Sequence, residues 1–208
     1  MKQVRKQKTR EALIEVGLEL IHSTGYTATG INQIMAKAQV RSFYSHFASK
    51  DELVLEVIKR YMAIERERWD GVFRDPNLSP LNRLRQYFEV MIAARGASNG
   101  PIIGCLLGNL ALEIHEDRTE IRHLLRQELD LWQEALASMI REAVRKQELP
   151  RSTKPDNVAA VLIDNWQGAQ IRAKTQQSDV ALLLFFESAF NVLLRPTEDE
   201  SSLIHGID

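Results

Sequence analysis

The sequence predicts an all-α protein, and three observations support this fold class. Apolar residues recur at three- and four-residue spacing along nearly the whole chain. Strict alternation of apolar and polar residues, which is typical of strands, is rare. The 10 glycines and 6 prolines are grouped at a few places, so they separate the periodic segments rather than interrupt them.

The spacing of these segments and breaks predicts helices, with a clear loop at Gly96–Gly104 and a Ser-x-x-Glu capping box from Ser49 to Glu52. Within the third predicted helix, Phe43 and Phe47 lie one turn apart and face the same side. The predicted ranges are 9–25, 30–38, 42–47, 49–71, 81–97, 105–114, 119–148, 154–176 and 178–194.

Three short helices at the start, with a tight connection between the second and third, are typical of a helix-turn-helix unit. We therefore predict a DNA-binding domain over residues 1–48 and a helical sensing and dimerisation domain over 49–195. Residues 196–208 are predicted to be a flexible tail.

Composition limits the class of protein. No apolar run reaches the ~20 residues that a membrane-spanning helix needs, and no signal peptide is visible, so we expect a cytoplasmic protein. A single cysteine, Cys105, excludes a disulfide within the chain.

Charge is distributed unevenly along the chain. Residues 1–50 contain eight Lys or Arg and three Glu, a net charge of +5, whereas residues 51–208 carry −6. A basic N-terminal segment on an otherwise acidic chain suits a protein that contacts phosphate with one end. The alternative is that the basic stretch from Lys2 to Arg10 is a solvated, frayed terminus.

Two stretches make a family resemblance specific: residues 24–31 read TGYTATGI and residues 43–53 read FYSHFASKDEL, with Ile34, Ala38 and Val40 between them. Together they resemble the signature of the TetR family of repressors. The resemblance implies a dimer of subunits of about nine helices. It also implies that the dimer binds a palindromic double-stranded operator and is released when a ligand or modification acts on the C-terminal domain.

The resemblance and the side-chain chemistry together indicate the DNA contacts. Tyr44 and His46 lie between the two phenylalanines expected to be buried, so they should point outward to phosphate or base edges. Lys50 adds charge near free helix-start amides, and Arg41 is the candidate for a base contact. The alternatives are that Tyr44 only packs and Lys50 is only solvated. The predicted DNA-binding residues are Thr29, Arg41, Ser42, Tyr44, Ser45, His46 and Lys50.

The turn before these residues departs from the family pattern. Relatives usually have about three residues, often including a glycine, between the positions of Val40 and Ser42, whereas here only Arg41 intervenes. Either the recognition helix starts late and loses its first base contacts, or residues of the natural turn are missing from the sequence.

Two features of the C-terminal domain are GCL at 104–106 and the W-x-G-A-x-x-x-A-K pattern at 166–174. Together they resemble the electrophile- and redox-sensing repressors of the same family, those of the N-ethylmaleimide reductase and acrylate type. This resemblance implies that Cys105 is the sensor, with Lys174 and Trp166 nearby. Helix-start amides and an ammonium would lower the pKa of a thiol. The alternative is that Cys105 is a small buried hydrophobe.

Other classes fit less well. An enzyme would need a base beside Cys105, but His115, ten residues along the same helix, lies about 15 Å away by the helical rise, and His123 is a second candidate. A metal site would use Glu113, His115, Glu116, Asp117 and His123, which more often form a solvated face. We expect no enzyme activity, metal or cofactor. A dimeric small-molecule or redox-binding protein with weakened DNA binding stays open as an alternative function.

Dimerisation is expected through the last two helices, where a four-helix contact between two copies would bury apolar surface. The alternative is that these side chains face only the core of one subunit. They are Val158, Val161, Leu162, Leu183, Phe186, Phe190 and Leu194.

Overall fold

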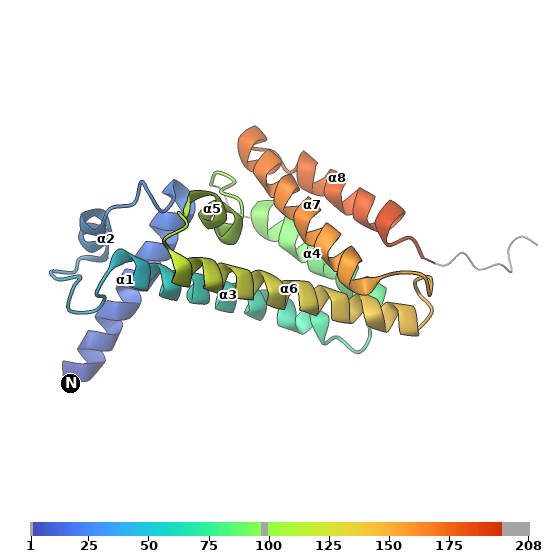
Figure 1. Cartoon of the computed structure of the whole chain (residues 1–208), viewed down its shortest axis with the longest axis horizontal. Coiled ribbons are helices and arrows are strands. Elements are labelled where there is room, and N and C mark those ends of the chain that lie inside the picture. The colour runs from blue at the N-terminus through green and yellow to red at the C-terminus, as the bar shows by residue number, and fades with distance from the viewer. Residues whose placement is uncertain (1, 97–99, 197–208) are drawn as a thin grey trace, which may run out of the picture. The chain divides into compact units, whose positions relative to one another are not determined.

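The computed structural model describes residues 2–96 and 100–196, and Figure 1 shows it as an arrangement of helices. No strand occurs within the two described ranges, and the predicted all-α fold class is confirmed. The elements are α1 (Lys2–Thr24), α2 (Ile31–Ala38), α3 (Lys50–Phe73), α4 (Pro80–Gly96), α5 (Leu106–Glu113), α6 (Thr119–Arg145), α7 (Pro155–Gln176), α8 (Val180–Ser188) and the π-helix η1 (Ala189–Leu193).

Two sequence predictions fall on the remaining residues. The predicted tail at 196–208 lies outside the described residues apart from residue 196, and so do residues 97–99 of the predicted loop. The predicted domain boundary between residues 48 and 49 stays a prediction.

The first helix begins earlier than predicted, at Lys2 rather than Thr9. The hydroxyl of Thr9 donates a hydrogen bond to the carbonyl of Arg5 at 2.9 Å, one turn back in the same helix. A threonine in this arrangement satisfies its hydroxyl within a helix instead of capping a helix start. No glycine or proline lies before it to end the helix.

The prediction of a third helix over residues 42–47 is wrong. α2 ends at Ala38. Its C-cap residue, Gln39, has a left-handed φ of 55°, and Val40 N–H bonds the carbonyl of Met35, which closes the helix end. Only one helical turn follows, in which Phe47 N–H bonds the carbonyl of Phe43 at 3.1 Å. With one residue between Val40 and Ser42, the chain must reach the start of α3 before a second turn can form.

The predicted Ser49 cap at the start of α3 is confirmed, and the Glu52 carboxylate reaches back to the residue before the cap. Ser49 Oγ accepts a hydrogen bond from Glu52 N–H at 3.1 Å, and the Glu52 carboxylate accepts one from Ala48 N–H at 2.6 Å. These contacts satisfy backbone donors that have no partner within the helix.

The chain divides into two compact units by its internal contacts: Met1–Asp70 with Gly100–Leu131 and Lys174–Gln177, and Gly71–Asn99 with Trp132–Ala173 and Ser178–Asp208. In the first unit, α1 packs against α2 and α5. Its core includes the fully buried side chains of Leu13, Ile34, Phe43 and Leu53.

The second unit has an aromatic core in which Phe88 contacts Trp166 and Phe185, with ring centroids 5.6 and 5.0 Å away. Such ring pairs add about 0.5–1.5 kcal/mol each beyond the area they bury. α4 packs against α8 in the same unit. None of the helices in the described ranges is both long and apolar enough to cross a membrane.

Candidate DNA interface and thiol site

The single turn after α2 presents polar side chains because its two phenylalanines face inward. Phe43 and Phe47 are 0 and 1% exposed, and their ring centroids lie 5.6 Å apart. Tyr44 between them is 70% exposed, which confirms its outward direction. Arg41, Ser42 and Ser45 are also exposed, and His46 is half-buried.

Basic side chains of α1 lie near this turn. Burial lowers the pKa of His46, and the charges of Lys6 and Arg10 lower it further. The Arg10 guanidinium also lies 4.8 Å from the centroid of the Phe47 ring and pairs with Glu56 at 3.2 Å. A solvated turn with lysine and arginine close by is an electrostatic environment that favours phosphate.

Thr29 has a different position from the other predicted DNA-binding residues. Its side chain is fully buried. The hydroxyl donates to the carbonyl of Gly25 at 2.7 Å and lies 2.9 Å from the hydroxyl of Thr24. The predicted DNA contact of Thr29 therefore gains no support from this geometry.

Lys50 is engaged with the turn that follows α1. Its ammonium donates to the carbonyl of Tyr26 and lies 4.1 Å from the centroid of the Tyr26 ring. The Tyr26 hydroxyl donates to Asp51 at 2.6 Å, and Arg118 pairs with the other oxygen of Asp51. Burial, together with the hydrogen bond and charge of Asp51, raises the pKa of Tyr26 to about 12. The phosphate contact of Lys50 stays a prediction, because its ammonium already has these partners.

The end of α5 also holds the turn after α1. Glu113 Oε2 accepts a hydrogen bond from Thr27 N–H at 2.9 Å. Gly25 in the same turn has a left-handed φ of 95°, and a Cβ built on it would lie 2.4 Å from Glu113 Oε1. Glycine at this position therefore permits both the turn and the close approach of the carboxylate. Sequence reasoning considered Glu113 only as a metal ligand. In the described part of the chain, no three His, Cys, Asp or Glu side chains are grouped so that they could hold a metal ion.

Cys105 occupies the N-cap position of α5 and is 6% exposed. The Tyr61 hydroxyl lies 3.9 Å from its sulfur and points a donor toward it. The Tyr61 ring packs edge-on against His22, whose Nε2 lies 2.9 Å from the carbonyl oxygen of Gly104. Sequence reasoning missed both His22 and Tyr61, because neither lies near Cys105 in the chain.

Lys174 lies beside the same segment, but its ammonium contacts Asn109. Nζ donates to Asn109 Oδ1 at 3.3 Å, and Asn109 Nδ2 donates to the carbonyl of Ile103 at 2.8 Å. Gly104 has a φ of 78°, and a Cβ built there would lie 3.6 Å from Lys174 Cδ. Lys174 is thus tied to the residues that flank Cys105, and its predicted pairing with a thiolate stays a prediction.

Trp166, the third predicted sensor residue, lies in the second unit and is fully buried. Its indole Nε1 has no hydrogen-bond partner among the described residues, and both side-chain polar atoms of Gln170, one turn later on α7, also lack partners there. Buried polar groups are normally satisfied by protein, water or a ligand. These atoms are therefore candidates for contacts with a polar small molecule.

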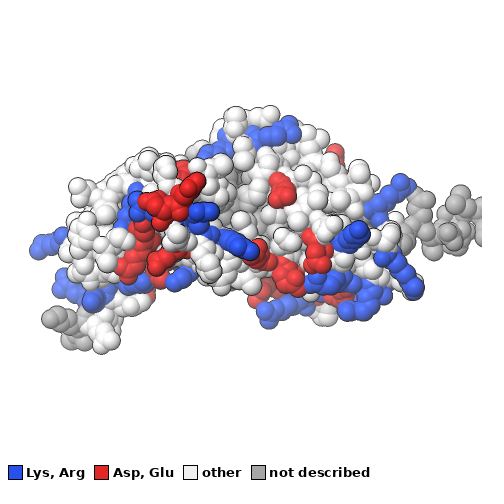
Figure 2. Space-filling model, in the orientation of Figure 1, with Lys and Arg blue, Asp and Glu red and all other residues white. Residues whose placement is uncertain are grey.

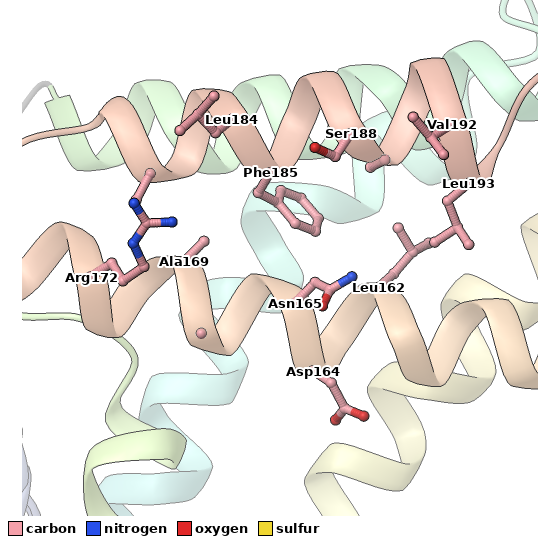
Figure 3. Close-up of a pocket in the computed structure, with 13 residues that line it drawn as sticks. Leu162, Asp164, Asn165, Ala169, Arg172, Leu184, Phe185, Ser188, Val192 and Leu193 are labelled. Carbon is pink, nitrogen blue, oxygen red and sulfur yellow. The ribbon is translucent and has the colours of Figure 1, made fainter.

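A groove of about 630 Å³ runs between α7 and α8 (Figure 3). Among the residues expected at a dimer contact, Val161 and Leu183 are 41 and 46% exposed, whereas Leu162, Phe190 and Leu194 are buried within the chain. The groove is lined by Leu162, Asp164, Asn165, Gly168, Ala169, Arg172, Ala181, Leu184, Phe185, Ser188, Ala189, Val192 and Leu193.

Comparison with protein families places these features in context. The model described as "Tetracyclin repressor-like, C-terminal domain" matches residues 80–188, and the model described as "Bacterial regulatory proteins, tetR family" matches residues 13–57.

Individual relatives match over most of the chain. The transcriptional regulator AcuR of Cereibacter sphaeroides is 35% identical over 80% of this chain and 76% of its own. The repressor DhaR of Mycobacterium sp. (strain GP1) is 29% identical over 93% of this chain and 96% of its own. The structure of Escherichia coli NemR in its reduced form superposes with a TM-score of 0.79, covering 89% of this chain and 96% of that one, at 24% identity.

Proposed function

Because the chain belongs to the TetR family of bacterial transcriptional regulators, we propose that it is a repressor whose release from operator DNA is controlled through Cys105. Regulators of this family bind operator DNA as dimers and respond to small molecules. The family and the matched relatives are regulators rather than enzymes. A cytoplasmic location, where chromosomal DNA is accessible, is part of the proposal.

The single observation that carries the sensor role is the position of Cys105 at the N-cap of α5, beside the Tyr61 hydroxyl. The Tyr61 hydroxyl gives the sulfur one hydrogen-bond donor, whereas the side chain of Cys105 makes no capping bond to the amides of α5. The thiolate is the form that reacts with electrophiles and oxidants. NemR, solved in its reduced form, is a relative for which a redox state is specified.

Burial of Cys105 determines which effectors can react. At 6% exposure the sulfur is accessible only to a small reagent or when the segment around Gly104 opens. Because Cys105 is buried, an adduct on its sulfur requires the surrounding side chains to move. Modification should therefore displace the start of α5.

A reversible effector is compatible with the same fold. Trp166 Nε1 and the amide of Gln170 offer three N–H donors, on two nitrogens, and one acceptor oxygen in the interior of the second unit. A small molecule with a carbonyl or carboxylate group would satisfy the donors. Fluorescence of the tryptophans during titration with candidate effectors would report such binding, with Gln170→Leu as the variant that should lose it.

The test is operator binding before and after treatment with N-ethylmaleimide, whose double bond takes up the Cys105 sulfur on one carbon and a proton on the other. Wild type should release DNA, Cys105→Ser should retain it, and Lys174→Ala should release it at a lower reagent concentration because the segment opens more easily. Release of DNA by treated Cys105→Ser would overturn the sensor role. Intact-protein mass measurement confirms in each case whether one adduct has formed.

One observation favours a second candidate function. Only a single turn occupies the place of the recognition helix, and base contacts usually come from the first residues of that helix. A dimeric small-molecule or redox-binding protein with weakened DNA affinity is therefore the alternative. It predicts DNA binding that does not discriminate between an operator and random sequence.

A further inference from the structure

Three residues on α7 form a charge pattern that is symmetric about a glycine. Asp164, Gly168 and Arg172 follow one another at four-residue spacing, so they lie along one face of the helix. All three are exposed, and all three line the groove between α7 and α8. Figure 3 shows Asp164 and Arg172 toward opposite ends of this stretch of α7, with Asn165 and Ala169 between them.

The two charges do not neutralise each other within the chain. Eight residues of helix separate their Cα atoms by about 12 Å along the axis, which is too far for an ion pair. Among the described residues, neither side chain forms an ion pair or hydrogen bond. By contrast, Asp156 at the start of the same helix pairs with Arg141 at 2.9 Å. Asp164 and Arg172 are thus available to groups outside the chain.

Gly168, midway between the charges, is the point at which another helix can approach α7 most closely. A Cβ built on Gly168 would meet nothing within 4 Å, so the surface there is open. Helix axes pack 8–10 Å apart depending on the side chains at the contact, and a glycine allows the short end of that range.

Apolar side chains surround this point. Val161 and Ile171 on α7 are 41 and 53% exposed, and Leu184 and Val192 on the other side of the groove are 47 and 78% exposed. On the face shown in Figure 2, the surface over α7 and α8 is largely uncharged. Exposed apolar side chains beside two unpaired, opposite charges suit a protein surface that supplies the matching charges.

We propose that Asp164 and Arg172 set the register of the expected contact between two copies of the chain, with the two-fold axis passing beside Gly168. In a two-fold contact, residue i of one subunit meets residue j of the other, and j meets i. When two α7 helices cross antiparallel at Gly168, Asp164 faces Arg172 of the partner subunit, and Arg172 faces Asp164 of the partner subunit. Two reciprocal ion pairs then fix the register and select this chain as its own partner.

This inference rests on the dimer of the proposed function and adds the residues that determine which chains can pair. A different regulator could lack the acidic residue before the crossing point or the basic residue after it. In a mixed dimer with such a regulator, Asp164 or Arg172 of this chain would be unpaired or would face a like charge. Such juxtapositions disfavour wrong partners. The pattern therefore predicts selective homodimers among related regulators in one cell.

The test uses two charge-reversal variants, one of which carries a tag so that the two differ in mass. Asp164→Arg places Arg opposite Arg twice in a homodimer, and Arg172→Asp places Asp opposite Asp twice, so each variant alone should dissociate with a constant raised by at least about tenfold. Mixed together, the two variants place Arg opposite Asp at both contacts. Native mass spectrometry should therefore show heterodimers almost exclusively. The double variant D164R/R172D should dimerise like wild type.

The controls separate this inference from the proposed dimer. Glu67→Arg, a reversal at an exposed site on α3, should leave dimerisation unchanged, and circular dichroism should show that every variant is folded. A dimeric wild type with unaffected single variants and statistical mixing would overturn the charge register while leaving the dimer in place. A wild type that is monomeric at micromolar concentration would overturn the dimer and this inference together.

Discussion

Glu113 and Thr27, which are 86 positions apart in the chain, are joined by a hydrogen bond of 2.9 Å from the Thr27 backbone N–H to the carboxylate. Glu113 is the last residue of the eight-residue helix α5, and Cys105 is its N-cap. At the other end of this helix, His22 of α1 bonds the carbonyl of Gly104. α1 and the turn after it are therefore tied to both ends of the helix that begins at the proposed sensor.

The first prediction concerns this tie. Replacing Glu113 with alanine removes the acceptor from Thr27 N–H, so the turn between α1 and α2 becomes less fixed. A hydrogen bond of this kind contributes about 1 kcal/mol net, so operator affinity should fall roughly fivefold without any effector present. Fluorescence anisotropy with a labelled operator measures the change. Glu116→Ala, at a neighbouring exposed site, is the matched control, and equal affinity for both variants would contradict the role of Glu113.

The second prediction concerns the pH dependence of DNA binding. The pKa of His46 lies below its ordinary value because of burial and the charges of Lys6 and Arg10. A bound phosphate would offset those cations and raise the pKa, so that binding takes up a proton. Operator affinity should then increase as the pH falls through the window between the free and bound pKa values.

His46→Gln should flatten this pH dependence, and NMR titration of the free protein should give a His46 pKa below about 6.5. The free energy of unfolding changes with pH in the opposite direction to operator affinity. A depressed pKa in the folded state means that the contribution of His46 is present above about pH 6.5 and is lost as the pH falls through the folded-state pKa. A pH profile of operator affinity that is identical in wild type and His46→Gln would show that His46 does not face the phosphate.

The third prediction concerns Tyr44. Its exposed hydroxyl is assigned to a phosphate, so Tyr44→Phe should weaken binding to operator and random DNA by a similar factor, about three- to tenfold. Tyr44→Ala should add only the loss of ring contacts. A tenfold loss for the operator alone would instead indicate that Tyr44 reads a base.

The fourth prediction concerns the start of α3. Ser49→Ala removes the cap of Glu52 N–H and should lower the free energy of unfolding by about 1 kcal/mol. Ser42→Ala, at an exposed serine in the preceding turn, should change it little. Urea denaturation followed by circular dichroism measures both, and equal stability of the two variants would contradict the cap.

The sequence was sufficient for features that depend on local spacing. Helical periodicity predicted the fold class, the Ser49 to Glu52 spacing predicted the cap, and the two phenylalanines predicted the exposed side of Tyr44. The one-turn segment at 42–47 was predicted as a helix because apolar periodicity does not take into account how few residues lie between α2 and α3.

Contacts between distant residues could not be predicted from spacing. Asp51 and Arg118 are 67 positions apart, and Tyr61 and Cys105 are 44 apart. Nothing in the local pattern of either residue identifies the other. The burial of Cys105 and the partner of the Lys174 ammonium depend on the packing of several helices, which a single sequence does not specify.

The measurement that tests the central claim most directly is selection of genomic DNA fragments by the purified protein, followed by titration of the enriched fragment at several salt concentrations. The account predicts a palindromic site that binds one dimer at least about a thousandfold more tightly than random DNA at physiological salt. It also predicts that the logarithm of affinity falls linearly with the logarithm of salt concentration. No enriched fragment, with equal retention of all sequences, would contradict an operator-binding repressor and favour the dimeric binding protein.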